Sequence, residues 1–232
     1  MLRRLIKASA VVIGVGLVAA GCSVTPVKAG AAAITGNQRI TIATLDTEVT
    51  NLGQTVKQYP GTIQLTEVQQ IQQTLTWLVR FQINDELARQ QGITVSTAQA
   101  NAALAELYAD AKSAAESQGL TNVTLDLILA ANGIPPNLYA ELGRYQAINN
   151  QYVKNVSGGT IPTSASGQAA ANTELEHAQC VAAKSLNIRI NPQFGRMDYS
   201  QPPYQVVSAP STVSGTPGPA PTVSASGQAP AC

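Results

Sequence analysis

Cys22 lies in the sequence context that most clearly indicates chemistry in this chain. Three basic residues stand among the first seven, residues 8–20 are uncharged and apolar, and residues 17–21 read Leu-Val-Ala-Ala-Gly. A basic start followed by a short apolar segment is typical of an export signal. Small residues directly before a cysteine look like a bacterial lipobox, where diacylglycerol is attached to the sulfur and a signal peptidase cuts just before the cysteine. We therefore expect residues 1–21 to be a signal peptide and Cys22 to be lipidated.

The length of the apolar segment argues against a transmembrane helix. It covers about 13 residues, whereas about 20 are needed to cross the hydrocarbon of a bilayer. Two or three acyl chains on one cysteine anchor more firmly than a single chain, since each buried methylene contributes about 0.8 kcal/mol. We expect an extracytoplasmic protein on the outer face of the cell membrane, anchored through Cys22, with residues 22–30 as a tether.

Cys180 and Cys232 are the two cysteines that remain. An exported compartment permits a disulfide, but the spacing leaves three alternatives open: a bond between them, an intermolecular bridge, or two free thiols. His177 follows Glu174 by three residues and precedes Cys180 by three, so a nucleophilic Cys–His pair is conceivable. The more common roles are a small buried packing residue for Cys180 and an exposed helical residue for His177, and these are our expectation.

Charge and composition exclude several classes of function. Removal of residues 1–21 takes away three of the 14 basic residues and none of the 13 acidic ones, which leaves a net charge of −2. Nucleic acid is therefore not an expected partner, because its binding depends on clustered Lys and Arg. One histidine and no close cysteine pair predict no metal site. Paired carboxylates and phosphate loops are also missing from the sequence, so we expect neither a cofactor nor an enzyme.

Helical periodicity dominates residues 31–207, which we expect to form one mostly helical domain. The pairs Thr66 with Gln69 and Ser96 with Gln99 match the capping box that opens a helix, and glycines follow the predicted helix ends. The second helix has two apolar faces, which implies two packing neighbours. The predicted helices are Leu45 to Tyr59, Thr66 to Gly92, Ser96 to Gly119, Thr121 to Asn132, Pro135 to Ser157, and Ala170 to Leu186.

Short strands are expected at both ends of this domain. Residues 31–42 predict a strand with a turn, residues 187–191 a second strand, and residues 199–207 an extended edge segment. Because a lone strand leaves backbone groups without partners, we expect the first and last strands to pair with each other. Residues 208–232 contain five prolines and no charge, which predicts a disordered tail.

Three segments carry a resemblance to a known family. They are Ile40–Asp46 (ITIATLD), Leu78–Ala88 (LVRFQINDELA) with its continuation Gly92–Ser96 (GITVS), and Asn187–Gly195 (NIRINPQFG). In this order they resemble the N-terminal chaperone module of the SurA family of exported folding factors, in its lipid-anchored actinobacterial form. The resemblance covers roughly residues 31–200. It implies a helical cradle closed by a small sheet that joins the two ends of the domain.

One part of the family pattern is missing. Many relatives insert a parvulin prolyl isomerase domain of about a hundred residues before the last helix, whereas only Gly158–Ala169 occupies that place here. A parvulin site also uses more than one histidine, and this chain has His177 alone. We therefore expect no isomerase activity.

The resemblance implies an ATP-independent chaperone or peptide-binding module for unfolded or exported polypeptides. An apolar groove between helices would shield such segments with low affinity, although aromatic residues of this kind are more often part of a core. A structural lipoprotein that docks a single envelope partner is the alternative. The candidate groove residues are Trp77, Phe81, Tyr108, Tyr139 and Tyr145.

Overall fold

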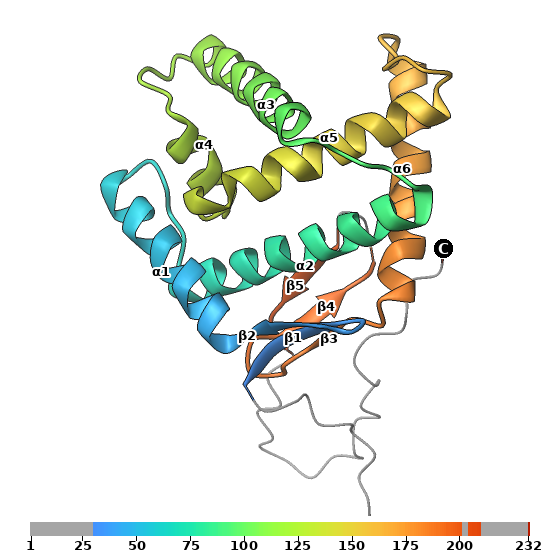
Figure 1. The fold of residues 1–232 in the computed structure, drawn as a ribbon. Helices are drawn as coiled ribbons and strands as arrows, with labels where there is room; N and C mark the ends of the chain where they lie inside the picture. The colour runs from blue at the N-terminus through green and yellow to red at the C-terminus, as the bar shows by residue number, and fades with distance from the viewer. Residues whose placement is uncertain (1–29, 201–203, 210–231) are drawn as a thin grey trace, which may run out of the picture.

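The protein is a mostly helical domain with six α-helices and two small antiparallel sheets in the described part of the chain (Figure 1). A computed structural model describes residues 30–200, 204–209 and 232. The elements in chain order are β1 (Ala31–Thr35), β2 (Gln38–Thr41), α1 (Ile42–Gln58), α2 (Glu67–Gln91), α3 (Thr97–Ser117), α4 (Leu125–Ala131), the 3-10 turn η1 (Pro136–Leu138), α5 (Tyr139–Val156), α6 (Ala165–Ser185), β3 (Arg189–Ile190), β4 (Arg196–Asp198) and β5 (Gln205–Val207).

Helix α2 is the long central element, and its predicted limits are confirmed. Thr66 and Gln69 form both hydrogen bonds of the capping box at its start. Gly92 ends it in the left-handed conformation, with φ of 63°, which glycine adopts without the steric cost that a Cβ adds. The helix runs through the middle of the domain, with the sheets on one side and α3, α4 and α5 on the other (Figure 1).

The N-terminal strand does pair with a C-terminal strand, but the C-terminal strands are divided between two separate sheets. Strand β1 lies between β2 and β3 in the order β2-β1-β3, and it pairs with β3 through Ala33 opposite Ile190. Asn191 extends this link, since its side chain donates to the Ala31 carbonyl at 3.0 Å. The last extended segment was expected to join β1 and does not, because β5 pairs with β4 instead.

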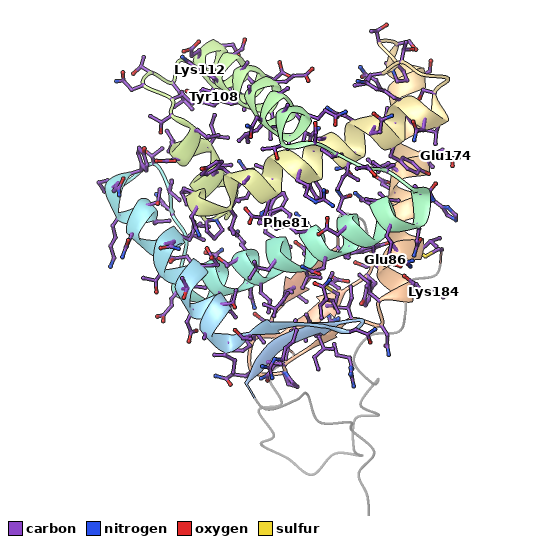
Figure 2. All side chains as sticks on the ribbon, in the orientation of Figure 1. Phe81, Glu86, Tyr108, Lys112, Glu174 and Lys184 are labelled. Atoms are coloured by element: carbon purple, nitrogen blue, oxygen red, sulfur yellow. A yellow bond between two sulfur atoms is a disulfide. The ribbon has the colours of Figure 1, made fainter. Side chains whose placement is uncertain are left out.

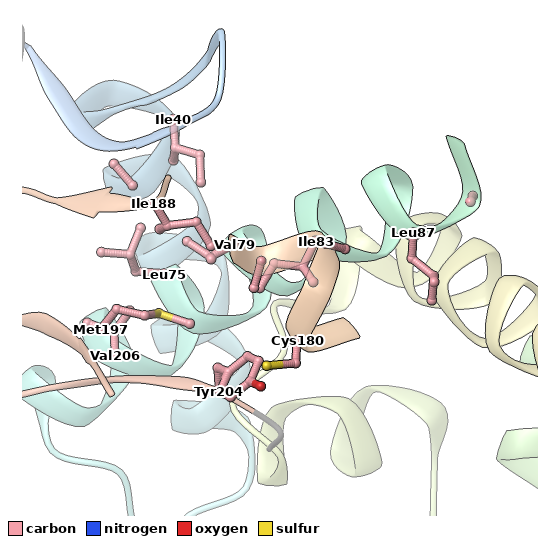
Figure 3. Close-up of a cluster of buried hydrophobic side chains, with 14 of the residues drawn as sticks. Ile40, Leu75, Val79, Ile83, Leu87, Cys180, Ile188, Met197, Tyr204 and Val206 are labelled. Carbon is pink, nitrogen blue, oxygen red and sulfur yellow. The ribbon is translucent and has the colours of Figure 1, made fainter. Parts of the chain in front are cut away.

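The main core lies between α2, the sheets and α6 (Figure 3). Leu75, Val79, Ile83 and Leu87 recur every four residues on α2 and so share one face. Small alanines meet them from β1 and α6, and small residues allow backbones to approach closely. These alanines from β1 and α6 are Ala32, Ala33, Ala178, Ala182 and Ala183, each at most 7% exposed.

The opposite side of α2 packs against a second cluster, as its two apolar faces predicted. Phe81 of α2 meets buried leucines from α3, α4 and α5. Helices α3 and α5 come close at Gly143, where an added Cβ would lie 2.6 Å from the Ala100 carbonyl oxygen. The domain therefore has two hydrophobic clusters, which pack against opposite sides of α2.

Four helices begin elsewhere than expected. Helix α1 starts at Ile42 instead of Leu45, with Thr41 as its cap. Helix α5 starts at Tyr139 instead of Pro135, after the 3-10 turn η1.

Helix α6 starts at Ala165, about five residues early, because the Ser164 hydroxyl accepts a hydrogen bond from the Gly167 N–H. Helix α4 starts at Leu125 instead of Thr121, with Thr124 as its cap. Hydroxyl residues compete as N-caps, so the sequence alone did not distinguish these positions from their neighbours.

Candidate functional site

Three of the five candidate aromatic residues lie together on the side of α2 that faces α5. Ring centroids are 5.8 Å apart for Trp77 and Phe81, 5.9 Å for Trp77 and Tyr145, and 6.1 Å for Phe81 and Tyr145. Phe81 is buried at 7% exposure, whereas Trp77 and Tyr145 are half-buried. Asn84 fixes α5 beside them, since its side chain donates to the Tyr145 carbonyl at 2.9 Å. Phe81 is labelled in Figure 2.

The other two candidates lie apart from this trio. Tyr108 of α3 donates its hydroxyl hydrogen to the Val123 carbonyl at 3.0 Å, so it holds the loop before α4 against α3. Tyr139 opens α5 and is 50% exposed. The expected set of five is therefore not one continuous binding surface.

An open groove of about 460 Å³ lies beside Trp77, between α2 and β5. Amide side chains dominate its lining, together with the edge of β5 and the end of α4. The sequence analysis expected an apolar groove, and this groove is mainly polar. Its lining residues are Gln69, Gln72, Gln73, Thr76, Trp77, Arg80, Asn132, Gln205, Val206, Val207 and Ser208.

Trp77 and Arg80 form one end of this groove. The Trp77 indole Nε1 donates to the Asn132 carbonyl at 3.0 Å, which joins α2 to the end of α4. The Arg80 guanidinium carbon lies 5.0 Å from the Trp77 ring centroid, within the range of a cation–π contact. Arg80 also donates through Nε to the Tyr204 carbonyl at 2.9 Å. Burial lowers the pKa of Arg80, but a guanidinium stays protonated in proteins.

Sequence reasoning missed the groove glutamines and Asn132. Polar residues on a helix normally face solvent, so Gln69, Gln72 and Gln73 gave no sign that a strand would come to lie beside them. Their regular spacing along α2 was a possible signal, because residues three and four apart share a helix face.

The two remaining cysteines are joined in a disulfide between Cys180 and Cys232. This is one of the three arrangements that the sequence left open. Cys180 is 6% exposed within the main core, and the neighbouring His177 and Glu174 are exposed. With its sulfur bonded to Cys232, Cys180 is not a free nucleophile in this structure. Within the described ranges, no group of three or more His, Cys, Asp or Glu residues is placed to hold a metal ion.

The predicted anchor lies outside the described residues. This applies to the signal peptide, to Cys22, to the tether before residue 30 and to most of the predicted tail, residues 210–231. Among the helices that the structure does describe, none is both long and apolar enough to cross a membrane.

Comparison of the chain with protein-family models, with curated proteins and with solved structures found no match.

Proposed function

We propose that this chain is a membrane-anchored extracytoplasmic lipoprotein that acts as an ATP-independent chaperone or peptide-binding module for exported proteins. The observation that carries the proposal is the open groove between α2 and β5. Its volume of about 460 Å³ falls in the range of about 300–1,000 Å³ usual for binding clefts. The resemblance of residues 40–46, 78–96 and 187–195 to the SurA chaperone module supports the same function.

The chemistry of the groove suits a chain that has not yet folded. Such a chain exposes backbone N–H and C=O groups together with apolar side chains. Glutamine and asparagine amides both donate and accept hydrogen bonds, and Trp77 adds an aromatic surface. Binding of this kind requires no nucleotide, and modest affinity lets the bound polypeptide dissociate. A lipid on Cys22 would keep the groove near the membrane surface where exported chains emerge.

The first test measures aggregation. The mature lipoprotein, held in phospholipid vesicles, should slow the aggregation of several unrelated proteins diluted from denaturant, and empty vesicles should not. Crosslinking in intact cells should then recover many exported proteins. A single stoichiometric partner, with no effect on aggregation, would favour the alternative of a structural lipoprotein that docks one envelope protein.

The second test concerns the anchor. Wild-type protein should incorporate a labelled acyl chain and sediment with membranes, and the Cys22→Ser variant should do neither. Unlabelled wild-type protein, or membrane association that survives the substitution, would refute lipidation at Cys22.

A further inference from the structure

Segment 204–208, which contains β5, is bound along α2 by a regular series of polar contacts. Three side chains spaced four residues apart on the helix contact every second residue of the segment. The contacts run from Arg80 Nε to the Tyr204 carbonyl (2.9 Å), from the Val206 N–H to Thr76 Oγ1 (2.8 Å), and from Gln72 Nε2 to the Ser208 hydroxyl (2.8 Å). We refer to Gln72, Thr76 and Arg80 as the occupied row.

The spacing of this row matches that of an extended chain. Four residues of α-helix advance about 6.0 Å, and two residues of strand advance about 6.6 Å. The two repeats stay nearly in step over the occupied row. Segment 204–208 runs antiparallel to α2, since Arg80 contacts its first residue and Gln72 its last. A row of polar side chains on α2 can therefore hold an extended segment mainly through its main chain.

A second row with the same spacing lies next to the first and lines the groove. Gln69, Gln73 and Trp77 each precede a member of the occupied row by three residues, so they form the adjacent ridge of the helix. We refer to them as the open row, in which the Gln69 side-chain oxygen already accepts hydrogen bonds from Thr66. The Gln73 side-chain oxygen is buried and makes no hydrogen bond within the described residues. This oxygen lies against Gly133. A buried acceptor without a donor is unfavourable, and its terminal amide torsion is soft, so rotation of the amide towards a donor in the groove would be favoured.

We infer that the open row binds an extended segment of another polypeptide through its backbone, alongside β5, with Trp77 contacting one side chain of that segment. This inference rests on the proposed function and specifies its ligand. The row spans eight residues of helix, about 12 Å, which corresponds to about four residues of extended chain. Because the amides are neutral and read the main chain, binding should tolerate many sequences and depend little on salt.

Trp77 provides the readout, since it is the only tryptophan in the sequence. The probe is a ten-residue peptide of alternating Thr and Ala without tryptophan, titrated into the mature lipoprotein in vesicles. Binding in the groove should change the emission of Trp77. A peptide of the same sequence that is N-methylated at every second residue lacks the N–H donors of one edge. It should bind at least ten-fold more weakly, and this comparison needs no protein variant.

Protein variants locate the site. Gln73→Ala should weaken binding of the unmodified peptide at least ten-fold, and it leaves the capping box of Thr66 and Gln69 intact. Gln91→Ala is the matched control, because Gln91 is exposed at the far end of α2, and it should bind like wild type. Thermal unfolding of each variant checks that the fold is retained.

The outcomes separate the inference from the proposed function. Equal binding of the N-methylated peptide, or unchanged binding by the Gln73→Ala variant, would overturn the open row as a backbone site even if wild type still suppresses aggregation. A wild-type protein that binds neither the peptide nor unfolded proteins would refute the proposed function itself.

Discussion

The two sides of α2 differ in how completely they are covered. On the side that faces the sheets and α6, Leu75, Val79 and Leu87 are all 0% exposed. On the side that faces α5 and the groove, Trp77 and Leu78 remain half-buried. Alanines cover the first side closely, whereas the second meets tilted and edge-on aromatic rings. We call these the covered side and the open side.

The two sides of α2 therefore contribute differently to folding and to binding. Close packing and full burial of aliphatic side chains supply most of the stability of a domain. Regions with fewer buried contacts open more readily and supply binding surfaces. The covered side should therefore control whether the domain folds, and the open side should control what it binds.

The largest effect is expected from a leucine truncation on the covered side. Leu75→Ala should lower the free energy of unfolding by about 3–5 kcal/mol, because it leaves a cavity in a closely packed core. Leu107→Ala, in the half-buried fringe of the cluster on the open side, should cost less than about 2 kcal/mol. Urea unfolding followed by circular dichroism measures both. Equal losses would contradict the difference between the two sides.

The disulfide should add to the stability of the covered side. It joins residues 52 apart in the sequence, and a loop of this size restricts the unfolded chain by up to about 4 kcal/mol. Cys232→Ser should lower the unfolding midpoint while Cys180 keeps its place in the core. Reduction of the wild-type protein should produce the same loss. If both treatments leave the midpoint unchanged, the bond has no stabilising role.

Gly133 tests the open side where it lies against Gln73, a residue that lines the groove. Its φ is 69°, and an added Cβ would overlap the Gln73 side chain. Gly133→Ala should therefore cost about 2–3 kcal/mol. Gly92→Ala is the matched control, because Gly92 has a similar φ of 63° but nothing within 4 Å of an added Cβ, so it should cost about 1 kcal/mol. Thermal unfolding of the two variants measures both costs. Gly92→Ala reports the backbone strain alone, so equal costs would exclude a contribution from steric overlap at Gly133.

The smallest effect concerns pH at the junction of α2 and α6. A hydrogen bond from Arg89, with further ones from Gln90 and Ser185, lowers the pKa of Glu86 from 4.5 to about 2 (Figure 2). A lowered pKa stabilises the folded state above pH 4.5, and this contribution is lost as the pH falls towards 2. Because Arg89 is largely exposed, the contribution should not exceed about 1 kcal/mol.

Glu86→Gln provides the check. Urea midpoints measured at pH 6 and pH 2.5 should fall less in the variant than in wild type, because the amide does not titrate. An identical fall in both proteins would show that Glu86 does not contribute to the pH dependence of stability.

Features that depend on neighbouring residues were predictable from the sequence. Thr66, Gln69 and Gly92 set the limits of α2, because capping and left-handed glycine act within one helical turn. The two apolar faces predicted for α2 each pack against a hydrophobic cluster, since helical periodicity is also a local property. The pairing of the N-terminal strand with residues 187–191 followed from the need to satisfy backbone groups.

The candidate site was only partly predictable. Trp77, Phe81 and Tyr145 were named from the sequence and lie together, but Tyr108 and Tyr139 have other surroundings. The groove itself was missed. Its second wall is β5, and the contacts that position β5 on α2 join residues 124 and 130 apart in the sequence.

The sequence by itself determined the helices and the two apolar faces of α2, because both depend on the order of neighbouring residues. Export and lipidation of the chain are predictions from the same kind of local pattern. Only the tertiary structure decided the partner of β5, the bond between Cys180 and Cys232, and which glutamines line a groove. A polar side chain has the same local signature on an open surface as in the wall of a groove, and contacts between distant segments are what distinguish the two.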